Sequence, residues 1–62
     1  MNLRHTLNTA ENAYVQQTAN YLGYTEMPAE LVERTLMHRK ERLHPYDAMW
    51  ELRRYLGLTV PA

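Results

Sequence analysis

The sequence predicts an all-α domain of three short helices, and three observations support this fold class. The chain of 62 residues contains no Ile, Phe or Ser, and its only apolar β-branched residues are three Val. Leu, Ala, Met, Glu and Arg are common, and these residues favour helix over strand. Apolar residues recur at helical spacing in three segments, which are separated by Gly and Pro residues. We therefore expect one small helical domain over residues 1–62.

The first helix is expected from about Thr9 to Leu22. Asn8 is a suitable N-cap, and Glu11 three residues later completes a capping-box pattern. Gly23 is suited to end the helix. The predicted inward stripe and its flanks are Leu7, Ala10, Tyr14, Thr18 and Tyr21, with Val15 and Leu22 beside them. We expect residues 1–7 to be frayed or loosely docked.

The second helix is expected from Pro28 to about Leu43, because Pro suits the first helical position. Its predicted inward stripe is Val32, Leu36, Arg39 and Leu43, flanked by Leu31 and Thr35. Arg39 lies in the middle of this stripe, where an unpaired buried guanidinium would be costly. Arg39 therefore extends to the edge of the core, pairs with a carboxylate, or faces another chain.

A sharp corner is expected at His44-Pro45, because Pro45 disfavours helical geometry in the residue before it. A connector of one or two residues is too short for an antiparallel return, so an angled corner is predicted. The alternative is one long helix kinked at the proline. The third helix should run from Pro45 to Leu56 and end at Gly57, with 58–62 as a short tail. Its predicted inner face consists of Ala48, Met49, Leu52, Tyr55 and Leu56.

Charge is balanced overall but divided along the chain. The formal net charge is zero, whereas residues 1–33 carry one positive and four negative side chains and residues 34–62 carry six positive and three negative ones. This asymmetry indicates either a polar partner, including a second copy of the chain, or two solvated faces of different sign. No apolar run approaches the ~20 residues of a membrane span, so a soluble cytoplasmic protein without membrane contact is expected.

Composition argues against catalysis and against a bound cofactor. Cys and Ser are absent, and no Thr lies in a recognisable nucleophile motif. General acid–base chemistry needs a pocket that shifts pKa values, and so short a chain has little volume for one. His38 and His44 are six residues apart, which matches no common metal-ligand spacing. We expect no enzyme activity, metal or cofactor.

Protein binding is the preferred function class. Tyr46, Trp50 and Arg53 share one helix edge at i, i+4 and i+7, and these residue types are enriched at the centres of interfaces. The alternative is that both aromatic side chains complete the core of a protein without Phe. The expected binding residues are Met37, Arg39, Arg42, Tyr46, Trp50, Arg53 and Arg54. We expect a regulator, inhibitor or accessory factor, of the phage or plasmid type, that binds a larger protein and can form a homodimer.

Nucleic-acid binding is the second hypothesis. Two helices joined by a tight corner within the basic region 34–54 invite comparison with a helix-turn-helix. Asp47 and Glu51 lie on the outward face of the expected recognition helix, where they would repel phosphate, and the net charge is zero. These features make nucleic acid the less favoured partner.

Overall fold

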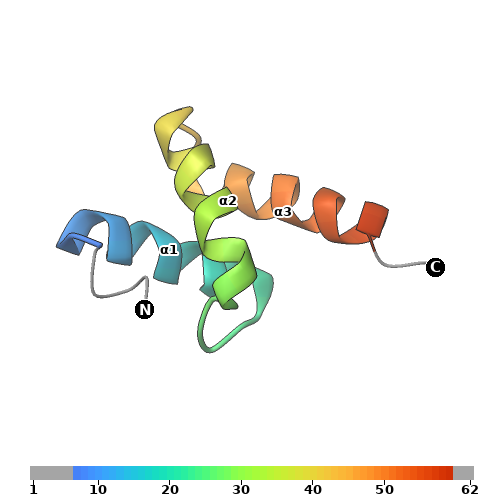
Figure 1. Cartoon of the computed structure of the whole chain (residues 1–62), viewed down its shortest axis with the longest axis horizontal. Helices are drawn as coiled ribbons and strands as arrows, with labels where there is room; N and C mark the ends of the chain where they lie inside the picture. The colour runs from blue at the N-terminus through green and yellow to red at the C-terminus, as the bar shows by residue number, and fades with distance from the viewer. Residues whose placement is uncertain (1–6, 60–62) are drawn as a thin grey trace.

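The computed structural model describes residues 7–59 and has three α-helices: α1 (Thr9–Leu22), α2 (Ala29–Lys40) and α3 (Pro45–Thr59). None of the described residues forms a strand, so the predicted all-α three-helix fold is confirmed. In Figure 1, α2 crosses the other two helices at a steep angle. Most of the segment predicted to be frayed lies outside the described residues. Leu7, the described member of that segment, is half-buried and packs against the core.

Both ends of α1 form as predicted. The Glu11 amide donates to the Asn8 side-chain oxygen at 2.8 Å, and the Asn8 amide donates to the Glu11 carboxylate at 3.0 Å. This reciprocal pair satisfies two amides that helical bonding leaves free. Gly23 follows the helix with φ of 91°, a left-handed conformation that glycine adopts without steric cost. The Tyr24 amide then donates to the Ala19 carbonyl at 2.9 Å, which completes the helix ending.

The connector between α2 and α3 differs from the prediction. α2 ends at Lys40 rather than Leu43, and residues 41–44 form the connector. Arg42 has φ of 65°, and the Leu43 amide donates to the His38 carbonyl at 3.1 Å. A left-handed residue therefore ends α2 before the influence of Pro45 is reached. The corner is nevertheless angled, as Figure 1 shows, and the alternative of one kinked helix is wrong.

The ends of α2 and α3 also differ from expectation at Pro28 and Gly57. Pro28 is the N-cap of α2 rather than its first helical residue. α3 continues through Gly57 to Thr59. Glycine inside a helix costs about 1 kcal/mol, which disfavours the helix without ending it. The next proline in the chain is Pro61, so no helix breaker lies between Gly57 and Thr59.

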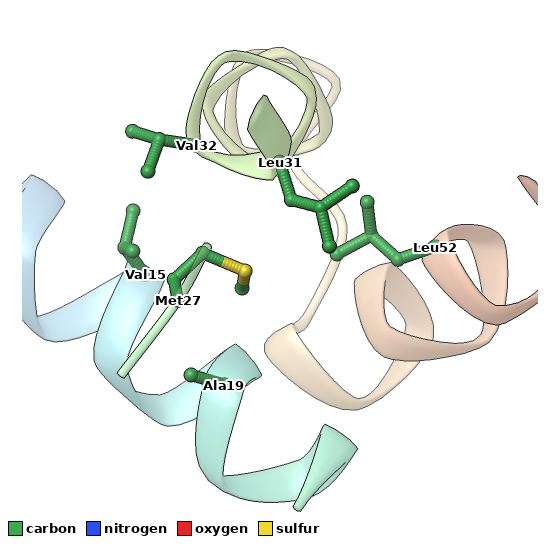
Figure 2. Close-up of a cluster of buried hydrophobic side chains, with 6 residues drawn as sticks. All are labelled: Val15, Ala19, Met27, Leu31, Val32 and Leu52. Atoms are coloured by element: carbon green, nitrogen blue, oxygen red, sulfur yellow. The ribbon is translucent and has the colours of Figure 1, made fainter. Parts of the chain in front are cut away.

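The hydrophobic core is built from all three helices and one connector residue. Figure 2 shows the side chains that form it: Val15 and Ala19 of α1, Met27 of the α1–α2 connector, Leu31 and Val32 of α2, and Leu52 of α3. Met27 is only 2% exposed, although the sequence placed it in a simple connector. The inner face predicted for α3 is confirmed, because Ala48, Met49 and Leu52 are buried.

Two predicted stripes are rotated relative to the observed core. On α1, Ala10 and Tyr21 are exposed, while Val15 and Ala19 are buried at its centre. On α2, Leu31, Val32 and Thr35 are buried, so the core-facing side lies towards the predicted flank. Arg39 consequently lies at the margin of this side and is exposed. The Arg39 guanidinium therefore remains hydrated in the folded protein.

Polar contacts between helices hold the corner and α3 in place. The Tyr14 hydroxyl of α1 donates to the Leu43 carbonyl in the connector at 2.9 Å. The Arg34 guanidinium of α2 lies 3.5 Å from the centre of the Tyr55 ring of α3, a close cation–π contact. The corner is thus attached to α1, and α2 is attached to α3.

Candidate interaction surface

Three aromatic side chains form a continuous row on the surface. Tyr21 of α1 and Tyr46 of α3 pack edge to face with their ring centres 5.4 Å apart. Tyr46 and Trp50 repeat this arrangement at 6.2 Å. The Arg53 guanidinium lies 5.2 Å from the centre of the Trp50 ring, and the His44 ring lies 6.4 Å from that of Tyr21. We call these five residues the aromatic surface.

The row of rings is ordered by its own contacts and remains open to solvent. Tyr21, Tyr46 and Trp50 are 39%, 47% and 51% exposed. Edge-to-face pairs are a favoured aromatic geometry, so each ring restrains its neighbour. The sequence left open whether Tyr46 and Trp50 belong to the core. Their exposure shows that about half of each side chain is available to a ligand.

His44 fixes the start of α3 beside this row. Its carbonyl accepts the Ala48 amide at 2.9 Å, which makes His44 the N-cap residue. Its Nδ1 accepts the Tyr46 amide at 3.0 Å, so the ring caps the helix as an Asn or Asp side chain would. Because Nδ1 is the acceptor, the proton of the neutral ring belongs on Nε2. The cap thereby orients the backbone that carries Tyr46.

The sequence missed Tyr21 and His44 as members of this surface. Helical spacing predicts Tyr21 on the inward stripe of α1, and Pro45 predicts only a corner at His44. Tyr21 and Tyr46 are brought together by the packing of α1 against α3, which no local sequence pattern reports. The i, i+4 and i+7 spacing of Tyr46, Trp50 and Arg53 was visible, and the structure does bring these three together.

The other predicted binding residues lie apart from these ring contacts. Met37 and Arg39 line a separate hollow beside α2. Arg42 lies in the connector in its left-handed conformation. Arg54 is exposed on α3 next to Arg53 and does not belong to the aromatic surface. The predicted set is therefore divided over the aromatic surface, the hollow beside α2, the connector and an exposed part of α3.

The aromatic surface continues onto an uncharged side of α1. Tyr21 shares a shallow hollow with four other exposed α1 residues, Ala13, Gln16, Gln17 and Asn20. The Gln16 amide donates to Asn20 Oδ1 at 3.1 Å and to the Thr25 carbonyl at 2.9 Å, which holds it in place. A ligand on the aromatic rings would thus meet amide and methyl groups on the α1 side.

Residues 7–59 contain neither a candidate membrane-spanning helix nor a candidate metal site. Over residues 7–59, no helix combines the length and apolar character needed to cross a membrane. Within the same range, no three His, Asp or Glu side chains are grouped so that they could hold a metal ion. No family model, curated protein or solved structure matches the chain.

Proposed function

We propose that the chain is a non-catalytic protein-binding module, a cytoplasmic regulator or accessory factor that binds a larger protein through the aromatic surface. The observation that carries the proposal is the ordered row of Tyr21, Tyr46 and Trp50, each about half exposed. Trp, Tyr and Arg are the residues most enriched among those that dominate binding energy. Here all three types are adjacent.

The geometry favours binding because the aromatic side chains are already restrained, so little side-chain entropy is lost when a partner binds. Immobilising a free side chain at an interface costs about 0.5–1.5 kcal/mol. The edge-to-face contacts already restrain Tyr46 from both sides, through Tyr21 and Trp50. Each half-exposed ring still offers roughly 75–125 Å² of mainly apolar area that a partner can cover. The rings supply the apolar centre of an interface, and the amides of α1 supply a polar margin.

A helix-turn-helix role is the second candidate, and the observed connector favours it. The four residues between α2 and α3 match the three- or four-residue turn typical of this motif, whereas the sequence suggested a shorter corner. In such a motif α3 would enter the major groove. Asp47 and Glu51 are exposed on α3 and would oppose phosphate there. We therefore rank this role below protein binding.

The proposal is tested by affinity capture from a cell lysate with the tagged full chain and two matched variants. Trp50→Ala removes the centre of the aromatic row. Leu58→Ala removes another exposed apolar side chain of the same helix, 83% exposed and outside the row. We expect the wild type and Leu58→Ala to retain the same protein, and Trp50→Ala to lose it. Removing a central Trp typically costs at least 2 kcal/mol, which is a loss of about 30-fold in affinity.

Two controls separate the alternatives. Circular dichroism should show equal helix content in all three proteins, because Trp50 lies outside the buried core. Nuclease treatment of the lysate should leave capture unchanged. A DNA duplex shifted at low salt, with the shift abolished by Arg39→Glu plus Arg42→Glu, would favour the nucleic-acid role instead. Equal capture by the wild type and Trp50→Ala would contradict the assignment of the site.

A further inference from the structure

The outer side of α2 carries a second surface that the proposed function does not use. Figure 2 looks roughly along α2 and shows α1 and α3 on the same side of it. Glu33, Met37 and Lys40 are exposed, Met37 to 61%, and Leu36 is half-buried. Met37 is large and apolar, and it stands among charged neighbours. This pattern is unlike that of a uniformly solvated helix face.

These residues form one stripe along α2. Glu33, Leu36 and Lys40 follow at spacings of three and four, and Met37 lies one turn beyond Glu33. They border a hollow of about 360 Å³ at the edge of α2 that lies beside α1, and its remaining lining residues are Arg39 and Glu11, the latter in the first turn of α1. The lining therefore contains two acidic and two basic side chains around an apolar centre. Such a surface has no net charge to attract a strongly acidic or basic partner.

We propose that the occupant of this stripe is a second copy of the chain, with the two α2 helices antiparallel about a two-fold axis. In this arrangement Leu36 and Met37 of both copies meet at the axis. Glu33 of each copy then faces Lys40 of the other, because residues 33 and 40 are equidistant from the midpoint between 36 and 37. A two-fold interface places the same surface on both partners, so this charge order complements itself.

The order of charges along α2 disfavours a parallel dimer. The short length of α2 limits the strength of the antiparallel dimer. In a parallel pair Glu33 would face Glu33 of the other copy and Lys40 would face Lys40, and such like-charge contacts across an interface are destabilising. α2 has only 12 residues, so the contact is smaller than the roughly 800 Å² per partner of a standard interface. We therefore expect a weak dimer, with a dissociation constant on the order of micromolar to 100 μM.

This pairing would make the protein bivalent. The residues of the aromatic surface come from α1, α3 and the connector between α2 and α3. A dimer joined through α2 would therefore carry that surface twice. Two linked sites bind a multivalent partner more tightly than one site does. The inference stands independently of the proposed function, since the two surfaces use different residues.

Sedimentation of the full chain, from about 1 μM to about 1 mM, tests the dimer. We expect the wild type to pass from monomer to dimer over this range. Glu33→Lys alone and Lys40→Glu alone should each raise the dissociation constant at least tenfold, because like charges then face each other. An equimolar mixture of the two variants should dimerise again, since it restores opposite charges at both contacts. The double variant carrying both changes should also recover the dimer.

Matched controls make the outcome decisive. Glu51→Lys and Arg54→Glu make the same charge changes on exposed sites of α3 and should leave the dimer unchanged. If either reversal lowers helix content, Met37→Lys replaces it, because it places like charges at the axis. A monomer at every concentration, or failure of the mixture to recover the dimer, would overturn the inference. Loss of the dimer in Trp50→Ala would also overturn it, by moving self-association to the aromatic surface.

Discussion

The Tyr14 hydroxyl donates a hydrogen bond to the Leu43 carbonyl, 29 residues away, at 2.9 Å. This bond attaches the connector before α3 to the middle of α1. Tyr14→Phe keeps the ring and removes the donor, and we expect it to lower the free energy of unfolding by about 1 kcal/mol. Urea unfolding measures this loss. Tyr46→Phe is the control, because its hydroxyl has no hydrogen-bond partner among the described residues, and an equal loss there would contradict the assignment.

Tyr14 also gives the fold a dependence on alkaline pH. Burial raises the pKa of its hydroxyl above the ordinary value of 10.0; the nearby Arg39 lowers it, and Asp47 and Glu41 raise it. Above pH 10 the unfolded chain loses this proton first, so the free energy of unfolding falls as pH rises through the raised pKa. Below pH 10 the contribution is fully present. The stability difference between the wild type and Tyr14→Phe should therefore be constant below about pH 10 and shrink as the pH rises from there through the raised pKa of Tyr14. A difference that stays constant above this pH as well would contradict it.

The imidazole cap of α3 predicts an ordered series of substitutions at His44. His44→Ala removes the acceptor for the Tyr46 amide and should cost about 0.5–2 kcal/mol. His44→Asn should retain most of the stability, because Asn is among the preferred N-caps. Thermal unfolding of the three proteins gives the order. If His44→Ala and His44→Asn lower the stability equally, the capping hydrogen bond contributes nothing. The contact of the His44 ring with the Tyr21 ring then accounts for the effect of His44.

Arg42 is the one non-glycine residue among 7–59 with positive φ. The left-handed conformation costs an ordinary residue roughly 1–2 kcal/mol. Glycine avoids this cost, but it loses more conformational entropy on folding, so the net gain is smaller. Arg42→Gly should therefore stabilise the protein by about 0.5–1 kcal/mol, measured by urea unfolding. Arg54→Gly, inside α3, should destabilise by about 1 kcal/mol. Stabilisation with unchanged capture would also remove Arg42 from the predicted binding residues.

Local signals in the sequence predicted the features that depend only on neighbouring residues. Asn8 and Glu11 at spacing three, and Gly23 after an apolar turn, fixed both ends of α1. The inner face of α3 followed from spacing, because Ala48, Met49 and Leu52 all face one direction. The edge of Tyr46, Trp50 and Arg53 is visible for the same reason. These predictions need no knowledge of how the helices pack.

The remaining features depend on packing between segments distant in the sequence. Met27 of the α1–α2 connector packs into the core, and no periodicity applies to a connector. Arg42 ends α2 in a conformation that Arg rarely adopts, so the residue type does not predict a helix end at this position. Tyr21 joins the aromatic surface only after α1 has docked on α3. The orientation of α2 against the core also decides that Arg39 lies at the margin of its core-facing side rather than at the centre.

The aromatic surface is assembled from both ends of the sequence, since Tyr21 lies in α1 and Trp50 in α3. Only the folded chain presents it, so a partner at the proposed site would bind the native state alone and would shift the folding equilibrium by mass action. At a free partner concentration of 100 times the dissociation constant, this linkage adds about 2.7 kcal/mol. A chain of this size has a stability of roughly 3–9 kcal/mol. Its lifetime against proteolysis in a cell would therefore follow the abundance of its partner.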